Sequence, residues 1–252
     1  MVQLLAQQVN AYLVKKLIQD LGVDCGGPTT VLLRGSSVVG SDDGSTIMLL
    51  PGDTPVDITA SGVNGLDTGS EAPNAWYAIF MIRNPDTEQV AGLLSLSPTA
   101  PTMPSGFTQK RLIGFVRNDV SSNFMWFRQK DRVVQYYSPP LLYNGVKLAG
   151  NIAVGIGALA PFPYSKLLEV CPYTLYNTSP ADTGFDISYS SGASGRHYVD
   201  VDGGMPFPAA GIWGTGGSYP TYTDDSGQVF LNSGQLLAGC VCSVIGFTLT
   251  GI

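Results

Sequence analysis

The side chains that could carry out catalysis are few, and none stands in a recognisable catalytic pattern. His197 is the only histidine, and it lies in the strand-like segment RHYVDV (196–201). A histidine base acts on a nucleophile beside it, and the chain has no G-x-S-x-G motif to supply one. We therefore predict a structural or surface role for His197 and no catalytic residue. A pair of carboxylates for glycoside hydrolysis stays open, because their separation is a three-dimensional property.

Three segments match ligand-binding motifs only in part. Residues 155–160 (GIGALA) lack the third glycine of a dinucleotide fingerprint and run into Pro161 and Pro163, so we predict a strand or turn. Residues 200–204 (DVDGG) start like a calcium loop but have no glutamate at the twelfth position, which favours a β-turn. Residues 41–44 (SDDG) favour a turn over a cation site, because no further oxygen ligands follow. No metal and no cofactor is predicted.

The four cysteines fit neither a disulfide framework nor a zinc site in number and spacing. They are Cys25, Cys171, Cys240 and Cys242. Cys240 and Cys242 would share one face of a strand, and we interpret them as buried small apolar residues. Synthesis in a reducing cytoplasm suits this composition.

One long loop has the composition of a binding surface. Residues 207–225 (FPAAGIWGTGGSYPTYTDD) place Trp213, Tyr219 and Tyr222 among glycines, with Asp224 and Asp225 at the end. Exposed aromatic rings stack on sugar faces and carboxylates accept hydroxyl hydrogen bonds, so the loop could bind a glycan. We favour the other interpretation, in which Trp213 fills the end of a β-sandwich or a seam between subunits.

Residues 1–23 (MVQLLAQQVNAYLVKKLIQDLGV) predict the one helix of the chain, with Gly22 as its stop signal. At about 100° per residue, apolar side chains fall on two sides. One side has Val2, Leu5, Ala6, Val9, Tyr12 and Leu13, and the other has Leu4, Ala11, Val14 and Ile18. Two apolar faces need two covering surfaces. The helix is either sandwiched within its own chain or packed between its own domain and a neighbouring subunit through Leu5, Val9, Tyr12 and Leu13.

Composition favours a β protein and excludes some functions. Only 13% of residues are charged, whereas 31 are glycine and 17 proline, which favours short strands joined by tight turns. The net charge of −6, without a basic cluster, argues against nucleic-acid binding. The longest apolar stretch, residues 148–162, contains Asn151 and several glycines and ends at prolines, so we predict no membrane insertion.

The most regular succession of strand-like and turn-like segments lies in residues 65–117 and continues to 137. The predicted strands there are residues 75–83 (AWYAIFMIR), 89–97 (QVAGLLSLS), 110–117 (KRLIGFVR), 124–128 (FMWFR) and 133–137 (VVQYY). Pro98, Pro101 and Pro104 make the intervening segment an extended crossover. Together these elements predict a meander.

The second half alternates short strands with loops, after a soft boundary at Ser138-Pro139-Pro140. Asn144-Gly145 is interpreted as a hairpin turn. Further strands are predicted at residues 166–171, 184–190, 196–201, 228–232 and 237–250. We predict a mainly β fold with two antiparallel sandwich or jelly-roll-like domains and one N-terminal helix. Its parts are residues 1–24 (attachment or oligomerisation helix), 25–138 and 139–252, with one large β unit as the alternative.

Residues 62–137 carry a resemblance to a known class. Their order is GLDTG (65–69), the aromatic strand AWYAIF, the strand GLLSLS, the proline-bracketed PTMPSGFT and the strand KRLIGFVR. This order resembles a module of many tailed-bacteriophage and prophage virion proteins, found in fibres, collars and decoration proteins. The C-terminal LLAGCVCSVIGFTLTGI resembles the last strands of such proteins.

The resemblance implies a non-enzymatic structural component of a tailed-phage virion, made in the host bacterial cytoplasm. Its expected partners are itself, as a homo-oligomer and by analogy with fibres a homotrimer, and other virion proteins. A fibre-like tail, collar or head-associated role is favoured, because the N-terminal helix resembles an attachment device. The alternatives are a host-attachment module that binds surface glycan and a capsid decoration protein. A glycan-degrading enzyme ranks last.

Overall fold

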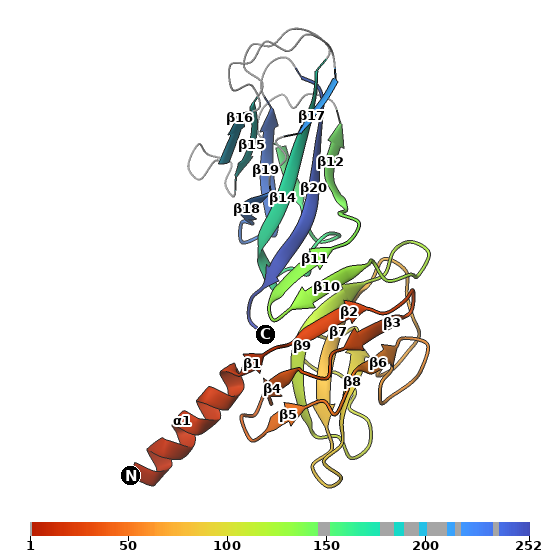
Figure 1. Ribbon diagram of the computed structural model, residues 1–252, viewed down its shortest axis with the longest axis vertical. Helices are drawn as coiled ribbons and strands as arrows, with labels where there is room; N and C mark the ends of the chain where they lie inside the picture. Colours follow the sequence, from red (N-terminus) through yellow and green to blue (C-terminus); the bar gives the residue numbers. More distant parts are fainter. Residues whose placement is uncertain are drawn as a thin grey trace. The chain divides into compact units, whose positions relative to one another are not determined.

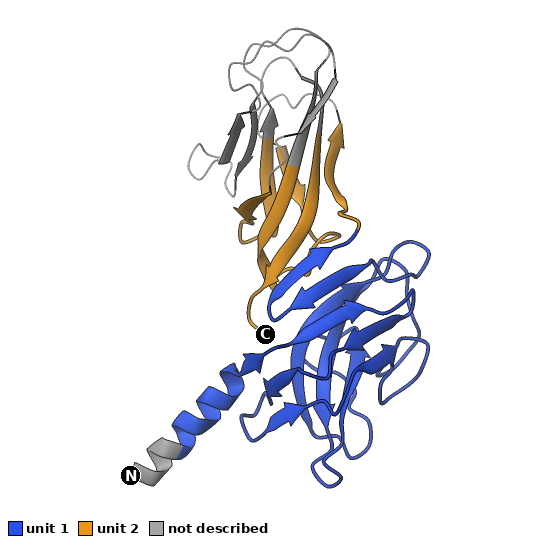
Figure 2. Cartoon of the chain, viewed as in Figure 1, with its two compact units in different colours: residues 1–137, 252 blue, residues 138–251 orange. Residues whose placement is uncertain are grey.

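The chain forms two compact units, Met1–Tyr137 with Ile252, and Ser138–Gly251 (Figure 2). The structure is a computed structural model that describes residues 2–145, 152–176, 184–188, 197–200, 211–214, 218–233 and 237–252. It confirms the predicted fold class, which is mainly β and β-sandwich-like, with several antiparallel sheets and one helix near the N-terminus (Figure 1). The helix is α1 (Val2–Lys16).

The strands of unit 1 form three antiparallel groups. They are β1 (Ile18–Gln19), β2 (Gly22–Cys25), β3 (Thr30–Leu33), β4 (Val38–Gly40), β5 (Ile47–Leu49), β6 (Thr54–Asp57), β7 (Trp76–Arg83), β8 (Val90–Ser95), β9 (Gln109–Arg117), β10 (Phe127–Lys130) and β11 (Val133–Tyr136). Their orders are β1-β4-β5, β8-β7-β9 and, within this unit, β11-β10-β2-β3-β6.

The sheet β8-β7-β9 is the core of unit 1. Residues Ile79 and Met81 of β7 point to one face and Phe80 and Ile82 to the other, and all four are fully buried. The continuous apolar run of β7 follows from this, because a strand covered on both sides shows no polar alternation. Gly92 of β8 pairs with Met81 and faces strands β3 and β6 of the β11-β10-β2-β3-β6 sheet.

The predicted meander is wrong in its connectivity, although the strands predicted at residues 75–83, 89–97, 110–117 and 133–137 correspond to β7, β8, β9 and β11. The strand predicted at residues 124–128 is misplaced, because β10 begins at Phe127 and runs to Lys130. β9 pairs with β7 and not with β8, so the proline-rich segment carries the chain across to the other edge of β7. The hairpin β10-β11 joins a different sheet through β2. The segment 98–104 contains three prolines, which have no backbone N–H to donate, so it suits a crossover. Packing then determines which strand β9 pairs with.

The predicted extent of the helix is also wrong. α1 ends at Lys16, not near Gly22, and Gly22 begins strand β2. β2 pairs with both β3 and β10, and its alternate residues Val23 and Cys25 are buried. Sheet pairing on two sides outweighs the helical spacing of the apolar residues, as tertiary contacts commonly outweigh local propensity.

The GLDTG segment builds a junction. Asp67 accepts hydrogen bonds from Ser95 Oγ at 2.7 Å and from the backbone N–H of Thr102 at 2.8 Å. Leu66 forms a parallel bridge with Leu94 of β8, and the N–H of Asp67 donates to Leu94 O at 2.8 Å. The aspartate therefore ties the proline-rich crossover to β8.

Unit 2 is built on two long antiparallel strands, β14 (Ser165–Tyr176) and β20 (Leu237–Leu249). The strand β12 (Leu141–Gly145) flanks β20, whereas β17 (Gly211–Gly214) and β18 (Tyr219–Tyr222) flank β14. A second sheet has the order β13-β19-β15-β16, formed by β13 (Ile152–Gly155), β19 (Gln228–Ser233), β15 (Gly184–Ser188) and β16 (His197–Asp200).

Two predictions for unit 2 are wrong. Asn144 and Gly145 form no turn but lie in β12, opposite Val241 and Cys240. The segment 207–225 is not one loop, because it contains β17 and β18. In both cases the long strands offer backbone partners along their length, and pairing satisfies peptide groups that a loop would leave to water.

We predict that Gly92→Ala destabilises unit 1. A Cβ atom at Gly92 would overlap Val56 of β6 and lie 3.0 Å from Leu33 of β3, and overpacking of this kind costs about 1–3 kcal/mol. Urea unfolding should show a lower midpoint. Gly52→Ala is the control, because no atom lies within 4 Å of its added Cβ and its effect should stay within about 0.5 kcal/mol. Equal midpoints for the two variants would contradict the close sheet packing.

Candidate functional site

The C-terminal half of α1 rests on the β4–β5 hairpin. Ala11 and Val14 are half-buried on the side of the helix that faces the hairpin. A Cβ atom at Gly40 would overlap Val14 O, and one at Gly44, which has φ +73, would lie 2.5 Å from Ala11 O. The two glycines let the helix backbone approach the hairpin directly. This face is the second of the two apolar faces expected from the sequence.

Arg111 of β9 fixes the end of the helix. Its Nη1 donates to Lys15 O at 2.6 Å, and its side chain is buried. The N–H of Gly40 donates to Leu17 O at 3.0 Å, which joins the chain just after the helix to β4. A guanidinium here satisfies a carbonyl that the helix leaves unpaired and places a cation at the negative end of the helix dipole.

Asp42 completes the anchor electrostatically. Its Oδ1 lies 3.8 Å from Nη1 of Arg111, and its N–H donates to Lys110 O at 2.9 Å. Burial lowers the pKa of Arg111, whereas the attraction of Asp42 raises it. Burial raises the pKa of Asp42, and Arg111 opposes that shift. Each charge thus offsets part of the cost of desolvating the other.

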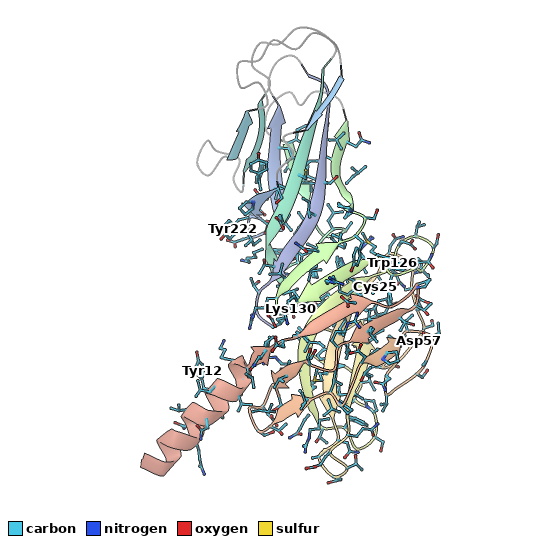
Figure 3. All side chains as sticks on the ribbon, viewed as in Figure 1. Tyr12, Cys25, Asp57, Trp126, Lys130 and Tyr222 are labelled. Carbon is cyan, nitrogen blue, oxygen red and sulfur yellow. The ribbon has the colours of Figure 1, made fainter. Side chains whose placement is uncertain are left out.

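The opposite face of α1 is open. Val9, Tyr12 and Leu13 are 53%, 61% and 58% exposed. Figure 3 labels Tyr12 on the helix. Lys16 extends over the ring of Tyr12, with Nζ 5.8 Å from the ring centroid. The side chain of Leu5 lies outside the described part of the chain. Three large apolar side chains on one face of an anchored helix are therefore available to another surface.

A second exposed apolar face lies on β5, and the sequence analysis missed it. Ile47 and Leu49 are 52% and 56% exposed, whereas Met48 between them is fully buried. The signal was present in the sequence of residues 46–50 (TIMLL), because a strand with one solvated face should alternate with polar residues and this segment does not.

The residues predicted for glycan binding are not brought together in the described structure. Tyr219 and Tyr222 are three positions apart on β18, so their side chains leave opposite faces of that strand. Tyr222 is exposed and Tyr219 is half-buried. The backbone of Trp213 pairs with Thr174 in β17, and its side chain lies outside the described part.

The two aspartates of that segment have other partners. Asp224 Oδ1 accepts hydrogen bonds from the N–H groups of Ser226 and Gln228, at 2.9 and 2.8 Å, and thereby shapes a turn. Asp225 pairs with Lys166 Nζ at 3.1 Å on the surface. In the described structure, neither carboxylate contacts an aromatic ring of this segment through a hydrogen bond or ion pair.

An aromatic pair on the β10–β11 hairpin was not predicted as a site. Trp126, labelled in Figure 3, and Tyr137 are exposed. The N–H of Tyr137 donates to Trp126 O at 3.0 Å. Arg128, two residues after Trp126 and therefore on the same face, has its guanidinium carbon 6.0 Å from the centroid of the Tyr137 ring. Flat rings beside a donor-rich side chain can bind planar or sugar-like ligands.

The described residues contain no group of three or more side chains that could hold a metal ion. His197 lies in β16 with its side chain undescribed, and residues 201–204 are outside the described part. The thiols of Cys25, Cys171 and Cys242 are buried. No helix in the part that the structure describes is long and apolar enough to cross a membrane.

Comparisons with known proteins identify no family: no protein-family model matches the chain, and no curated protein matches it. Function is therefore inferred from the exposed surfaces and from the resemblance over residues 62–137.

We predict that Arg111→Met loosens the helix. Loss of the hydrogen bond to Lys15 O should lower the unfolding free energy by about 1–3 kcal/mol. Hydrogen exchange of the Gly40 amide, which depends on the same junction, should accelerate about tenfold or more. The matched control is Arg128→Met, because Arg128 is a surface residue whose ion pair with Asp24 contributes little. If Gly40 exchanges equally in both variants, Arg111 is not the anchor.

Proposed function

We propose that this chain is a non-enzymatic structural component of a tailed-phage virion that acts through oligomeric assembly, with α1 as its assembly element. The observation that carries the proposal is the exposed face of Val9, Tyr12 and Leu13 on a helix whose other face is fixed to unit 1. The resemblance of residues 62–137 to virion modules supports the setting.

Exposure of that apolar face to water is unfavourable in free energy. Full burial of one large apolar side chain is worth about 1.5–3 kcal/mol, so covering three of them is a substantial driving force for association. A helix of 15 residues is only marginally stable alone and depends on packing. A partner that covers the open face stabilises both the helix and the assembly.

The proposed assembly is a homotrimer in a fibre-like tail, collar or head-associated position, in contact with other virion proteins. Closed cyclic symmetry is the usual outcome for copies of one chain. A capsid decoration protein is the alternative within the same class, and it would use the open helix face for docking on its target.

A second candidate function is binding of host-surface glycan. The observation that favours it is the exposed Trp126 and Tyr137 with Arg128 beside them on one face of the β10–β11 hairpin. Aromatic rings stack on sugar faces, and the guanidinium donates to hydroxyl or acidic groups. This face replaces the segment 207–225 as the proposed glycan-binding surface.

We predict that the full chain is oligomeric and that Val9→Glu/Leu13→Glu is monomeric. Light scattering should give about three times the chain mass of 26.6 kDa for the unmodified protein and 26.6 kDa for the variant. The control Gln8→Glu/Asn10→Glu adds the same charges at exposed positions outside the apolar face and should keep the oligomer. Deletion of residues 1–23 would be a less informative test than the substitutions, because it would also remove part of β2.

The proposal fails if the helix variant and the unmodified chain have the same mass. Circular dichroism of each variant shows whether the β fold is intact. A helix variant that is folded and still oligomeric would show that assembly does not use α1.

For the second candidate, we predict that the protein binds one or more members of a panel of purified bacterial surface polysaccharides. Trp126→Ala should weaken that binding about 5- to 150-fold, because loss of one stacking aromatic ring is worth on the order of 1–3 kcal/mol. Val120→Ala changes another exposed apolar residue and is the control. Binding that survives Trp126→Ala unchanged would remove this hairpin from consideration.

A further inference from the structure

We propose that the exposed face of the β10–β11 hairpin prefers acidic polysaccharides to neutral ones, and that Arg128 binds the acidic group. This inference rests on glycan binding, the second candidate function given above, and names the class of glycan. Three observations carry it: the side chains that share the face, the hydrogen bonds of Arg128, and the charge of the hairpin compared with that of the whole chain.

The face is one side of a regular two-stranded hairpin. Phe127 pairs with Tyr136 and Gln129 with Val134, and all four side chains are buried. The residues that alternate with them point to the other side. At about 3.3 Å per residue, the outward residues of one strand span about 13 Å, which is longer than a single sugar ring. These outward residues are all exposed: Trp126, Arg128, Lys130, Val133, Gln135 and Tyr137.

Polar side chains lie beside the two aromatic rings of this face. Trp126 is joined to Tyr137 by a backbone hydrogen bond, and the next outward pair is Arg128 with Gln135. The guanidinium carbon of Arg128 lies 6.0 Å from the centroid of the Tyr137 ring. The core of an interface with another protein is apolar, whereas the central pair of this face is polar. Aromatic rings for stacking, with hydrogen-bond donors beside them, suit a chain of sugars instead.

Arg128 keeps donors available for a ligand although it forms an ion pair. Its Nε donates to Asp24 Oδ1 at 3.3 Å, and its side chain is 63% exposed. The other carboxylate oxygen of Asp24 accepts two hydrogen bonds from Arg34, so two arginines share one carboxylate. Nη1 and Nη2 of Arg128 make no hydrogen bond to any residue that the structure describes. Two such donors match the two oxygens of a carboxylate or of a phosphate.

The hairpin is basic within an acidic chain. Residues 126–137 include three basic residues and one acidic residue, a net charge of +2, whereas the whole chain has a net charge of −6. A local excess of cations attracts anionic polymers to this face. The four charged residues are Arg128, Lys130, Asp131 and Arg132.

The ion pair of Lys130 does not prevent it from contacting a ligand. Lys130 Nζ lies 3.0 Å from Asp20 Oδ1, and both side chains are more than half exposed. Surface pairs of this kind contribute little free energy, so an anionic group of a ligand can replace Asp20. Lys130 follows Arg128 by two positions and therefore lies on the same face, where it can bind a second acidic group of the polymer.

The test compares charged and neutral forms of the same polymers. The probes are polygalacturonate and alginate, which carry carboxylates, the carboxyl-reduced neutral form of each, and a poly(glycerol phosphate) teichoic acid, which carries phosphates. We expect the full chain to bind at least one acidic polymer about tenfold or more tightly than either neutral form, as measured by calorimetry. Added salt should weaken that binding. Binding to the teichoic acid alone would identify phosphate as the acidic group.

Variants assign the preference to this face. Arg128→Gln should weaken binding of the acidic polymer about tenfold or more, because it removes a charged hydrogen-bond donor, and Lys130→Gln should also weaken it. The matched control is Lys166→Gln, because Lys166 is a surface lysine paired with the exposed Asp225, and its loss should leave binding unchanged. Circular dichroism checks the fold of each variant. If Arg128→Gln does not fold, Lys130→Gln by itself must weaken binding.

Other outcomes separate this inference from glycan binding in general. If the neutral forms bind as tightly as the acidic ones or more tightly, glycan binding stands and the acidic class is wrong. Equal affinities of Arg128→Gln and Lys166→Gln for the acidic polymer would overturn the role of Arg128. If no polymer of either kind binds, both proposals fail. A lower oligomeric mass of Trp126→Ala in light scattering would make the face a subunit interface and would overturn both.

Discussion

The burial of both faces of the β8-β7-β9 sheet is the constraint from which the arrangement of unit 1 follows. Gly92 permits close contact with β3 and β6 on one side, and Gln129 of β10 lies against β9. The side-chain amide of Gln129 donates to Ile113 O at 2.7 Å and to Asp131 O at 2.8 Å. Such buried hydrogen bonds specify which strands are neighbours, because a mismatched neighbour would leave them unsatisfied.

The same sheet determines where the helix is held. Arg111 belongs to β9, and its guanidinium reaches the last turn of α1, so the position of the helix depends on the best-packed part of the unit. The two faces of the helix differ in kind. The inner face approaches Gly40 through backbone contacts, whereas the outer face offers Tyr12 and two aliphatic side chains. Tyrosine is enriched among residues that dominate binding energy at interfaces.

The sequence indicated what could be decided locally, and the structure shows where local signals end. The uninterrupted apolar run of β7 predicted a buried strand, because that pattern depends only on having both faces covered. The end of α1 at Lys16 could not be predicted, because Gly22 and Val23 fit a helix until β3 and β10 are known to pair with them. The pairing of β9 with β7 depends on packing between distant segments, for which the sequence has no periodic signal. Only part of the candidate surface was predicted from the sequence. The two apolar sides of the helix were predicted, but the exposure of Ile47 and Leu49 was not.

A helix that is anchored before assembly changes the energetics of assembly. Association of a loose segment must overcome the loss of its conformational freedom, which subtracts from the affinity that the contacts provide. The bond from Arg111 to Lys15 O and the close contact at Gly40 fix α1 in the monomer. Exposed apolar residues on a fixed helix can then contribute most of their burial free energy to binding. Arg111 and Asp42 each offset part of the desolvation of the other, which adds an electrostatic contribution to the anchor. Anchoring and assembly are thus coupled through the last turn of a single helix.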